Sequence, residues 1–406
     1  MKLSKYLLLS VLATNGISCE EAPKGSLPPL VQAFSNPAGA RSSLPYLYTY
    51  GGKSLMSWVE RTGDSLAVLK YAEVSDTTWQ APKAILEAKD WFVNWADFPV
   101  IVENHGHLMT HVLKKSSAGT YSYDVKLNIL PRGASKWTTD LALHTDGTAS
   151  EHGFVSAMPY REDYFFVTWL DGRNTVGGDD EHRGAMTIRA AVVGVDGSIG
   201  KEVVLDDRTC DCCQTTAAMT ENGPVVIYRD RSQEEVRDMS IVRWVDGQWT
   251  APVTVHEDNW KIKGCPVNGP KAAALGNNLA VAWFTASNNE PKVQLVFSDD
   301  GGAHFDAPIR IDSSNAMGRV DLALIDKQTA LISWMAATET AAEIRAVKVS
   351  RSGQISAPVV IATLDASRNT GFPQMELVGD KVYFAWTDVH QAGSQVKTAY
   401  VALDRF

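Results

Sequence analysis

The chain has 406 residues, of which 45% are hydrophobic and 21% charged, and its formal net charge is -9. This composition is typical of a soluble globular protein and excludes a disordered chain. The negative charge, with no compensating run of Lys and Arg, argues against binding to nucleic acid, because a protein that follows phosphates needs a clustered basic surface.

The N-terminus has the pattern of an export signal. Lys2 and Lys5 precede an apolar stretch, residues 6–13, that is too short to span a bilayer. Small residues precede Cys19 without an Ala-x-Ala site, so the segment resembles a bacterial lipoprotein signal, although Gly16 stands where Leu is usual. We therefore predict a signal peptide at 1–18, lipidation of Cys19 and an extracytoplasmic protein that is anchored to the cell envelope by lipid alone. The alternative is an ordinary signal peptide and a periplasmic protein.

A strand-like apolar segment that ends in an aromatic residue recurs along the mature chain. Its copies lie at 55–58, 166–169, 226–228, 281–284, 331–334 and 383–386, with a weaker copy at 107–111. The copies are about 50 to 60 residues apart, which is the length of one four-stranded propeller blade.

The surroundings of each copy also repeat. An apolar strand precedes it, an alternating strand follows, and a strand of the form Trp/Phe-x-x-Pro-x-x-Ile/Val comes next, as at 79–85, 249–255 and 305–311. Helical periodicity is nearly absent. We predict an all-β fold, a β-propeller with seven four-stranded blades over residues 45–406. Six blades are the alternative, and a pair of β-sandwiches is the competing fold.

The last copy ends after three strands. Residues 20–44 are predicted to be a linker and a closing strand, in which the segment at 30–34 supplies the missing strand. Closure of the ring removes free sheet edges.

One turn is more specific than the others. Residues 298–305 read Ser-Asp-Asp-Gly-Gly-Ala-His-Phe, which resembles the Asp-box of sialidase-like (BNR-repeat) propellers. In such a turn, glycine adopts positive φ and Asp accepts hydrogen bonds from backbone amides. The resemblance implies a propeller over the whole mature chain. The chain lacks the Arg-Ile-Pro motif that contributes a carboxylate-binding arginine in that family, so the resemblance supports the fold more than the reaction.

The cysteines of the mature chain fall in two successive blade-to-blade loops. Cys210, Cys212 and Cys213 share one loop and Cys265 lies in the next, so the repeat predicts that the four thiols are neighbours on one face. An oxidising exterior favours two disulfides, with three pairings open. The alternative is a thiolate site for Cu or Zn in the reduced protein, which the cramped Cys-x-Cys-Cys spacing favours. No other cofactor is predicted.

Charged and aromatic residues in the loops of the same face indicate an anionic ligand. The candidate ligand-binding residues are Arg173, Arg229, Arg231, Arg237, Arg319, Arg368, Trp95, Trp260 and Asn268. The candidate catalytic residues are Asp97, Tyr228, Asp230, Glu234 and His152, because glycoside hydrolysis needs two carboxyl groups, or a Tyr nucleophile with an acid. For each residue the alternative is a solvated salt bridge, a buried ring or a structural histidine.

We therefore predict an exported monomer that recognises or hydrolyses an anionic glycan at the centre of the ring, as an exo-sialidase-like glycoside hydrolase if it is an enzyme. One alternative is a metal-binding or redox periplasmic protein organised by the four cysteines. The other is a non-catalytic scaffold.

Overall fold

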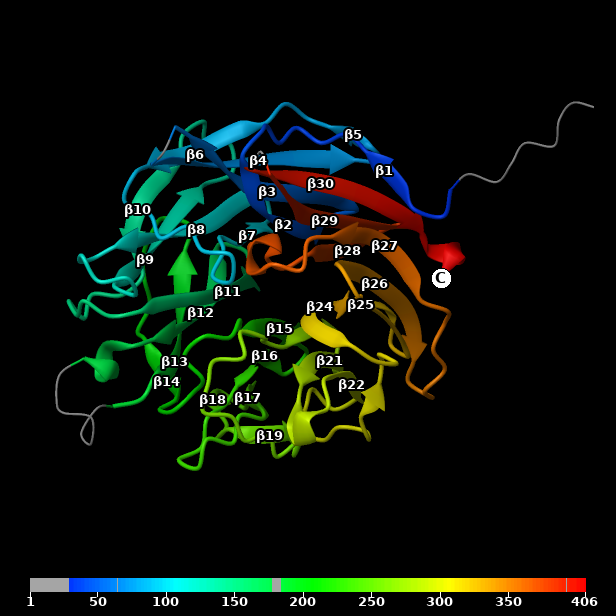
Figure 1. Ribbon diagram of the computed structural model, residues 1–406. Helices are drawn as coiled ribbons and strands as arrows, with labels where there is room; N and C mark the ends of the chain where they lie inside the picture. The colour runs from blue at the N-terminus through cyan, green and yellow to red at the C-terminus, as the bar shows by residue number, and fades with distance from the viewer. Residues whose placement is uncertain (1–28, 64, 177–183, 392) are drawn as a thin grey trace, which may run out of the picture.

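The computed structural model describes residues 29–63, 65–176, 184–391 and 393–406. The predicted signal peptide at 1–18 and Cys19 lie outside this part of the chain. Seven antiparallel sheets surround a central axis (Figure 1), which confirms the all-β propeller with seven blades rather than six.

Six blades are formed by strands that follow one another in the sequence, and the seventh combines the last three strands of the chain with the first. In chain order the strands are β1 (Gln32–Phe34); β2 (Ser42–Tyr50), β3 (Lys53–Thr62), β4 (Leu66–Ser75), β5 (Thr78–Trp79), β6 (Lys83–Ala88); β7 (Ile101–Asn104), β8 (His107–Lys115), β9 (Tyr123–Leu130), β10 (Thr138–Ala142); β11 (His152–Tyr160), β12 (Tyr164–Asp171), β13 (Thr187–Gly194), β14 (Val203–Asp206); β15 (Thr216–Thr220), β16 (Gly223–Arg229), β17 (Met239–Val245), β18 (Gln248–Trp249), β19 (Val253–His256); β20 (Lys271–Leu275), β21 (Asn278–Thr285), β22 (Lys292–Ser298), β23 (Ile309–Arg310); β24 (Ala316–Asp326), β25 (Thr329–Ala337), β26 (Ala342–Ser350), β27 (Val359–Leu364); β28 (Gln374–Val378), β29 (Lys381–His390) and β30 (Gly393–Ala402).

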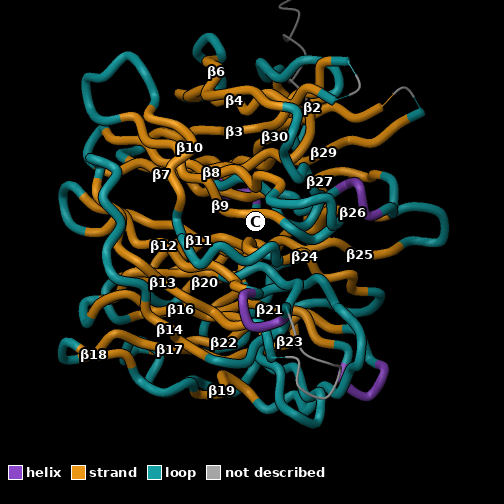
Figure 2. Tube along the Cα trace, turned by 90° about the vertical axis from the view of Figure 1, so that its left-hand side faces the viewer, coloured by secondary structure: helices purple, strands orange, loops and turns teal. Residues whose placement is uncertain are grey.

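Helical structure in the described residues is limited to short 3-10 turns, as the view from the side shows (Figure 2). They are η1 (Arg173–Thr175), η2 (Ser287–Asn289), η3 (Arg368–Thr370) and η4 (Leu403–Arg405). None of the helices described has the length and apolar character needed to cross a bilayer.

The fourth strand is split in two of the blades. Both β5 and β6 pair with β4, and both β18 and β19 pair with β17. The break in each case contains a proline, Pro82 or Pro252, which has no N–H to donate to the neighbouring strand. This explains the recurring Trp-x-x-Pro-x-x-Ile/Val pattern.

The ring is closed by the N-terminal strand, as predicted. β1 pairs antiparallel with β30, with Gln32 opposite Tyr400 and Phe34 opposite Thr398, so that the first and last strands of the chain lie side by side (Figure 1). The Phe34 ring stacks on Trp79 of the following blade, with ring centroids 6.0 Å apart. The last blade therefore becomes complete only with a strand from the opposite end of the chain.

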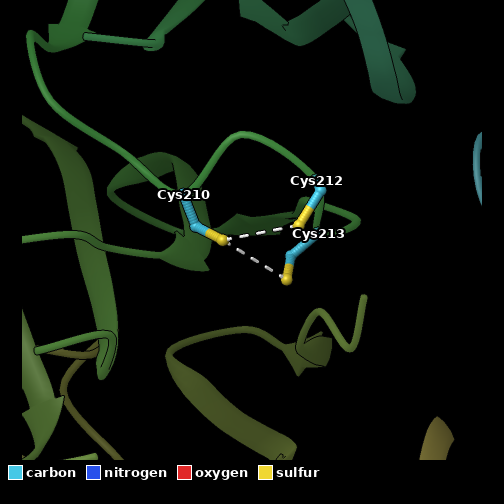
Figure 3. A group of neighbouring side chains, drawn as sticks. All are labelled: Cys210, Cys212 and Cys213. Atoms are coloured by element: carbon cyan, nitrogen blue, oxygen red, sulfur yellow. Dashed lines mark hydrogen bonds between the residues drawn. The ribbon is translucent and has the colours of Figure 1, made fainter. Parts of the chain in front are cut away.

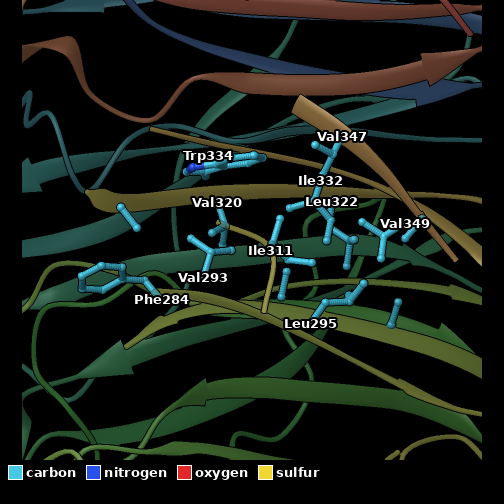
Figure 4. Close-up of a cluster of buried hydrophobic side chains, with 14 of the residues drawn as sticks. Phe284, Val293, Leu295, Ile311, Val320, Leu322, Ile332, Trp334, Val347 and Val349 are labelled. Carbon is cyan, nitrogen blue, oxygen red and sulfur yellow. The ribbon is translucent and has the colours of Figure 1, made fainter. Parts of the chain in front are cut away.

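The recurring aromatic residue of each second strand lies in the packing between blades. Trp58, Trp169 and Trp283 are fully buried. Between the blades of β20–β23 and β24–β27, apolar side chains from both sheets interdigitate, among them Phe284, Leu295 and Trp334 (Figure 4). Because both faces of each blade are covered, these strands read as continuous apolar runs in the sequence.

The Asp-box-like turn connects β22 to β23 and has the hydrogen bonds expected of it. Asp300 Oδ1 accepts from the backbone N–H groups of Ala303 (2.9 Å) and His304 (3.0 Å). Gly302 has a φ of 83°, and a Cβ there would lie 2.6 Å from Ile241 of the neighbouring blade. Both the backbone conformation and the packing thus require glycine.

Candidate functional site

A pocket of about 80 Å³ opens at the centre of the ring. First strands and blade-to-blade loops line it, including Tyr46 of β2, Phe154 of β11, Lys271 of β20 and Gln374 of β28. Asp97 and Phe372 come from loops. The first strand of a blade faces the axis, so side chains from distant parts of the sequence meet here.

A charged cluster lies at the wall of this pocket, where Lys271 and Tyr46 line it. Lys271 Nζ is 3.4 Å from Asp321 Oδ1 and 5.8 Å from the centre of the Tyr46 ring. Burial disfavours the charged amine, but Asp321, Tyr46 and Glu376 outweigh this effect and raise the pKa of Lys271 to about 12. Burial, together with the charge of Asp321, raises the pKa of Glu376 to about 7.

The sequence analysis missed Lys271, Asp321 and Glu376. Each is a charged residue in the first strand of a blade, next to apolar residues, and this exception to the apolar pattern is the signal that could have identified them. A charge on the innermost strand has to face the channel or a buried partner.

Asp97 belongs to a buried chain of acidic groups at the pocket wall. Its Oδ1 accepts a hydrogen bond from the Phe154 N–H (2.8 Å), and its Oδ2 lies 3.4 Å from the hydroxyl of Tyr123. Tyr123 donates to Glu151 Oε1 at 2.6 Å. Burial raises the pKa of Asp97 well above its ordinary range, and burial also raises the pKa of Glu151 to about 7. Asp97 was predicted as a site residue, whereas Tyr123 and Glu151 were not.

Arg319 lies behind the pocket wall, against two aromatic rings of which one, Phe372, lines the pocket. Its guanidinium carbon is 5.2 Å from the centre of the Trp95 ring and 5.9 Å from that of Phe372. The two rings are nearly parallel, with an interplanar angle of 9°. Trp95 also borders a second hollow, so this pair of rings separates that hollow from the central pocket.

The charge of Arg319 has no acidic partner in the described residues. Its Nη1 donates to Thr370 Oγ1 (2.6 Å) and to the Gly371 carbonyl (2.8 Å), and no described carboxylate lies within 4 Å. Burial, together with the nearby charge of exposed Arg368, lowers the pKa of Arg319 to about 10. Arg319 is therefore a buried cation that an external anion would stabilise.

Arg229 is buried too, but its guanidinium N–H groups donate to backbone carbonyl oxygens of the protein. They reach the carbonyl oxygens of Asn268 (3.1 and 2.8 Å), Arg237 (2.7 Å) and Phe284 (2.7 Å). Its guanidinium also lies 4.9 Å from the centre of the buried Trp260 ring. These contacts connect two loops with strand β21 and give Arg229 and Trp260 structural roles.

Asn268 links several of these groups. Its carbonyl oxygen accepts hydrogen bonds from the Arg229 guanidinium. Its Oδ1 accepts a hydrogen bond from the backbone N–H of Arg319 (2.7 Å), and its own backbone N–H donates to Cys213 Sγ (3.4 Å). The residue is buried and positions Arg319.

The remaining acidic and basic candidates around β16 form a local network. The Tyr228 hydroxyl donates to Asp206 (2.5 Å), and burial raises the pKa of Tyr228. Burial, together with Asp206, raises the pKa of Asp230 to about 6. Glu234 Oε2 accepts from the Ser232 hydroxyl at 3.0 Å. None of Tyr228, Asp230 and Glu234 lines the central pocket.

Arg231 and Arg237 share one carboxylate. Glu235 accepts from Arg231 Nη2 at 2.7 Å through Oε1 and from Arg237 Nη2 at 2.8 Å through Oε2. Both arginines therefore already have an acidic partner.

His152 and Arg173 lie in a buried charge network away from the pocket. The His152 ring stacks on His144 with centroids 3.8 Å apart, and its Nε2 is 3.3 Å from Asp146. Arg173 binds Asp171 through Nε (2.7 Å) and Nη2 (2.6 Å). Neither residue lines the central pocket.

The four cysteines converge on one face (Figure 3 shows three of them). Cys212 and Cys265 form a disulfide, so one of the two predicted disulfides is present. Cys210 and Cys213 are free and buried, and their Sγ atoms are 3.7 Å apart. The hydrogen bond from Cys213, opposed by burial and assisted by Arg237, lowers the pKa of Cys210 to about 6.

Comparison with known proteins adds to the assignment of the fold. No family model matches the chain, and no curated protein matches it. An ulvan lyase of polysaccharide lyase family PL25 is similar in structure, with 10% identity over 92% of this chain and 95% of that one and a TM-score of 0.54. The polysaccharide lyase Uly1 has 10% identity over 95% of this chain and 94% of that one, with a TM-score of 0.52.

The Trypanosoma rangeli sialidase in complex with the inhibitor DANA has 12% identity over 80% of this chain and a TM-score of 0.49. The match spans 56% of the length of that sialidase. At these identities the likeness shows the fold alone.

Proposed function

We propose that this protein binds an acidic saccharide at the central pocket and that Arg319 receives the anionic group. The observation that carries the proposal is a buried guanidinium, next to Phe372 of the pocket wall, with no carboxylate partner in the described residues. A buried cation without a partner is costly to the folded protein. A carboxylate or sulfate on the ligand would supply the missing charge and the paired hydrogen bonds that a guanidinium favours.

The aromatic rings beside Arg319 support a sugar rather than a small inorganic anion. Trp95 is half-buried next to the charge and borders the second hollow, and an aromatic face in such a place stacks on the C–H surfaces of sugar rings. The ulvan lyase of family PL25 has been solved with a bound -[GlcA(1-4)Rha3S]- saccharide, which carries an acidic sugar. The likeness to that protein extends only to the fold, so the proposal rests on Arg319 and its surroundings.

A second hollow suggests that the ligand is longer than one sugar. This hollow, of about 400 Å³, lies on the other side of Trp95 and is lined by Arg41, Arg61 and His390. No Asp or Glu of the described chain lines it. A basic hollow beside the central pocket, across one aromatic wall, suits an oligosaccharide that carries more than one anionic group.

For turnover we assign the proton donor to Asp97. It borders the pocket, and burial raises its pKa well above the ordinary range, a shift in the direction that a general acid for glycosidic bond cleavage needs. Binding without chemistry is the alternative within this proposal. The extracytoplasmic location predicted from residues 1–19 remains part of the proposal, since acidic glycans are found there.

The test is a binding measurement with matched ligands. Calorimetry with uronate, sulfated and sialylated oligosaccharides should detect binding, and neutral oligosaccharides of the same length should bind at least about tenfold more weakly. Arg319→Gln should weaken binding of the acidic ligand by about 10- to 100-fold. Arg351→Gln is the matched control, because Arg351 binds Asp306 at the outer hairpin. Equal binding of acidic and neutral ligands would refute the proposal.

The same ligands test for turnover. Release of reducing ends or of unsaturated products by the native chain, and its loss in Asp97→Asn with binding retained, would support an enzyme. Binding without products would support a lectin-like role.

A further inference from the structure

We propose that the four cysteines, once reduced, bind one thiophilic metal ion, Zn²⁺ or Cu⁺, as a closed tetrathiolate site that fixes the two loops beside the central pocket. The inference is independent of the saccharide proposal, because it rests on the sulfur atoms and their immediate contacts.

The spacing of the sulfur atoms is the first argument. Cys210 Sγ lies 3.8 Å from Cys212 Sγ and 3.7 Å from Cys213 Sγ (Figure 3). The ligand atoms of these three cysteines all lie within 4.8 Å of one another. Zinc to sulfur bonds of about 2.3 Å in a tetrahedron place the sulfurs roughly 3.8 Å apart. Cys265 is bonded to Cys212 in the disulfide, so its sulfur adjoins the same centre.

The surroundings of the thiols are the second argument. Arg237 Nη1 donates to Cys210 Sγ at 3.2 Å, and the Asn268 N–H donates to Cys213 Sγ at 3.4 Å. Donors directed at sulfur stabilise metal-bound thiolates, and the charge of Arg237 offsets part of their negative charge. The burial of Cys210 and Cys213 keeps competing water away from the site.

Metal binding requires the disulfide to be opened first. An external dithiol supplies two electrons and two protons to Cys212–Cys265 and is itself oxidised to a disulfide. Cys265 is exposed, so the reductant can attack the bond from the solvent side. The four thiols then exchange their protons for one ion. With four protein ligands and no open position, the ion has a structural role.

The position of the site explains what it would stabilise. Gln214 follows Cys213 directly, and its side chain donates to the Ala96 carbonyl (2.6 Å) and accepts from the Gly269 N–H (3.1 Å). Gln214 and Gly269 both line the central pocket. A metal that joins the two cysteine loops would therefore fix this part of the pocket wall.

The experiment starts with the full chain carrying Cys19→Ser, which removes the only other cysteine and serves as the matched control for all thiol counts. The protein is reduced with a dithiol under anaerobic conditions, incubated with Zn²⁺ or with Cu⁺ in separate arms, and desalted. Elemental analysis should give one ion per chain in at least one arm, which also identifies the metal. The Cys210→Ser/Cys213→Ser variant should retain less than a tenth as much.

A second measurement on the same protein guards against a variant that fails to fold. In the metal-loaded protein all four thiols should resist alkylation until a chelator is added, after which mass spectrometry should find four modified cysteines. Less than a tenth of an ion per chain in both arms, or rapid alkylation despite added metal, would overturn the proposal in favour of a disulfide with two unligated thiols.

Discussion

Two buried arginines at the same face show how the surroundings of a side chain decide its role. Arg229 directs its donors to three backbone carbonyl groups, whereas Arg319 keeps a charge without an acidic partner in the described residues. The sequence alone gave both residues the same interpretation. The difference arises from the carbonyl oxygens of neighbouring loops, whose positions no residue pattern encodes.

This contrast predicts different effects on stability. Arg229→Met should lower the free energy of unfolding by about 3–5 kcal/mol, because the carbonyls of Asn268, Arg237 and Phe284 lose their donor in a buried place. Urea denaturation measures the change. Arg351→Met, at an exposed ion pair, is the control and should cost less than about 1 kcal/mol. Equal costs for the two variants would contradict the structural role of Arg229.

Glu151 predicts a dependence of stability on pH. Its pKa is raised from 4.5 to about 7 in the folded protein, mainly by burial. The folded state therefore holds a proton that the unfolded state releases, so the contribution of this group to stability is complete below the unfolded pKa and is lost as pH rises towards 7.

Glu151→Gln should remove this dependence. Between about pH 5 and pH 8, the variant should lose roughly 2 kcal/mol less stability than the native chain, a value reduced for partial solvent screening. Chemical denaturation at a series of pH values measures it, with exposed Glu339→Gln as control. A parallel pH profile for native chain and Glu151→Gln would show that the carboxyl group ionises freely.

At the scale of single elements, the turn between β22 and β23 depends on one carboxylate. Asp300 accepts hydrogen bonds from two backbone amides and from the Ser298 hydroxyl. Burial opposes the charged form, but hydrogen bonds from His304, Ser298 and Ala303 outweigh it and lower the pKa of Asp300 to about 2. The stabilisation is therefore present above pH 3.8 and is lost as pH falls towards 2.

Asp300→Ala should lower stability by about 1 kcal/mol at neutral pH, because two amides of a tight turn lose their acceptor. Thermal unfolding followed by circular dichroism measures the change. Asp299→Ala in the same turn removes only an exposed contact with Arg351 and should have less than half the effect. A larger loss for Asp299→Ala would show that the turn is held by its ion pair.

The elements that could be predicted from the sequence are those whose side chains alternate or repeat. The aromatic residue at the end of each second strand located the blades, and even the weak copy at 107–111 corresponds to a strand, β8. The fourth strand was predicted as one strand across its proline, but in two blades the proline divides it into β5 and β6 or β18 and β19. The channel cluster of Lys271, Asp321 and Glu376 was missed, because each of its members is isolated in the sequence and only the ring brings the three together.

At the scale of the whole molecule, one short strand connects the two ends of the chain. Beyond the pairing of β1 with β30, Asn36 Nδ2 donates to the Val396 carbonyl at 3.1 Å and the Tyr400 hydroxyl donates to Gln32. The backbone N–H of Leu44 also donates to Thr387 Oγ1 at 3.1 Å, between the first and last blades. These contacts connect residues more than 340 positions apart, so their formation is entropically costly and late in folding.

Deletion of residues 29–36 should therefore lower the melting temperature by several degrees and leave β30 as an open edge. Scanning calorimetry measures the loss. A variant in which the same segment follows residue 405 through a short linker should recover most of it, because Gln32 lies opposite Tyr400, near the end of β30. Failure of this relocated segment to restore stability would mean that β1 contributes little to the join.

The strand that completes the last blade need not come from the same molecule. Two copies whose N-terminal arms exchange places would each regain every backbone pairing of β1 with β30, and such arm exchange between identical chains is an inexpensive route to a dimer. The length of polypeptide between β1 and β2, residues 35–41, then governs assembly: a shortened, strained tether favours exchange of arms between neighbouring molecules at high concentration, and a lengthened one favours the solitary ring.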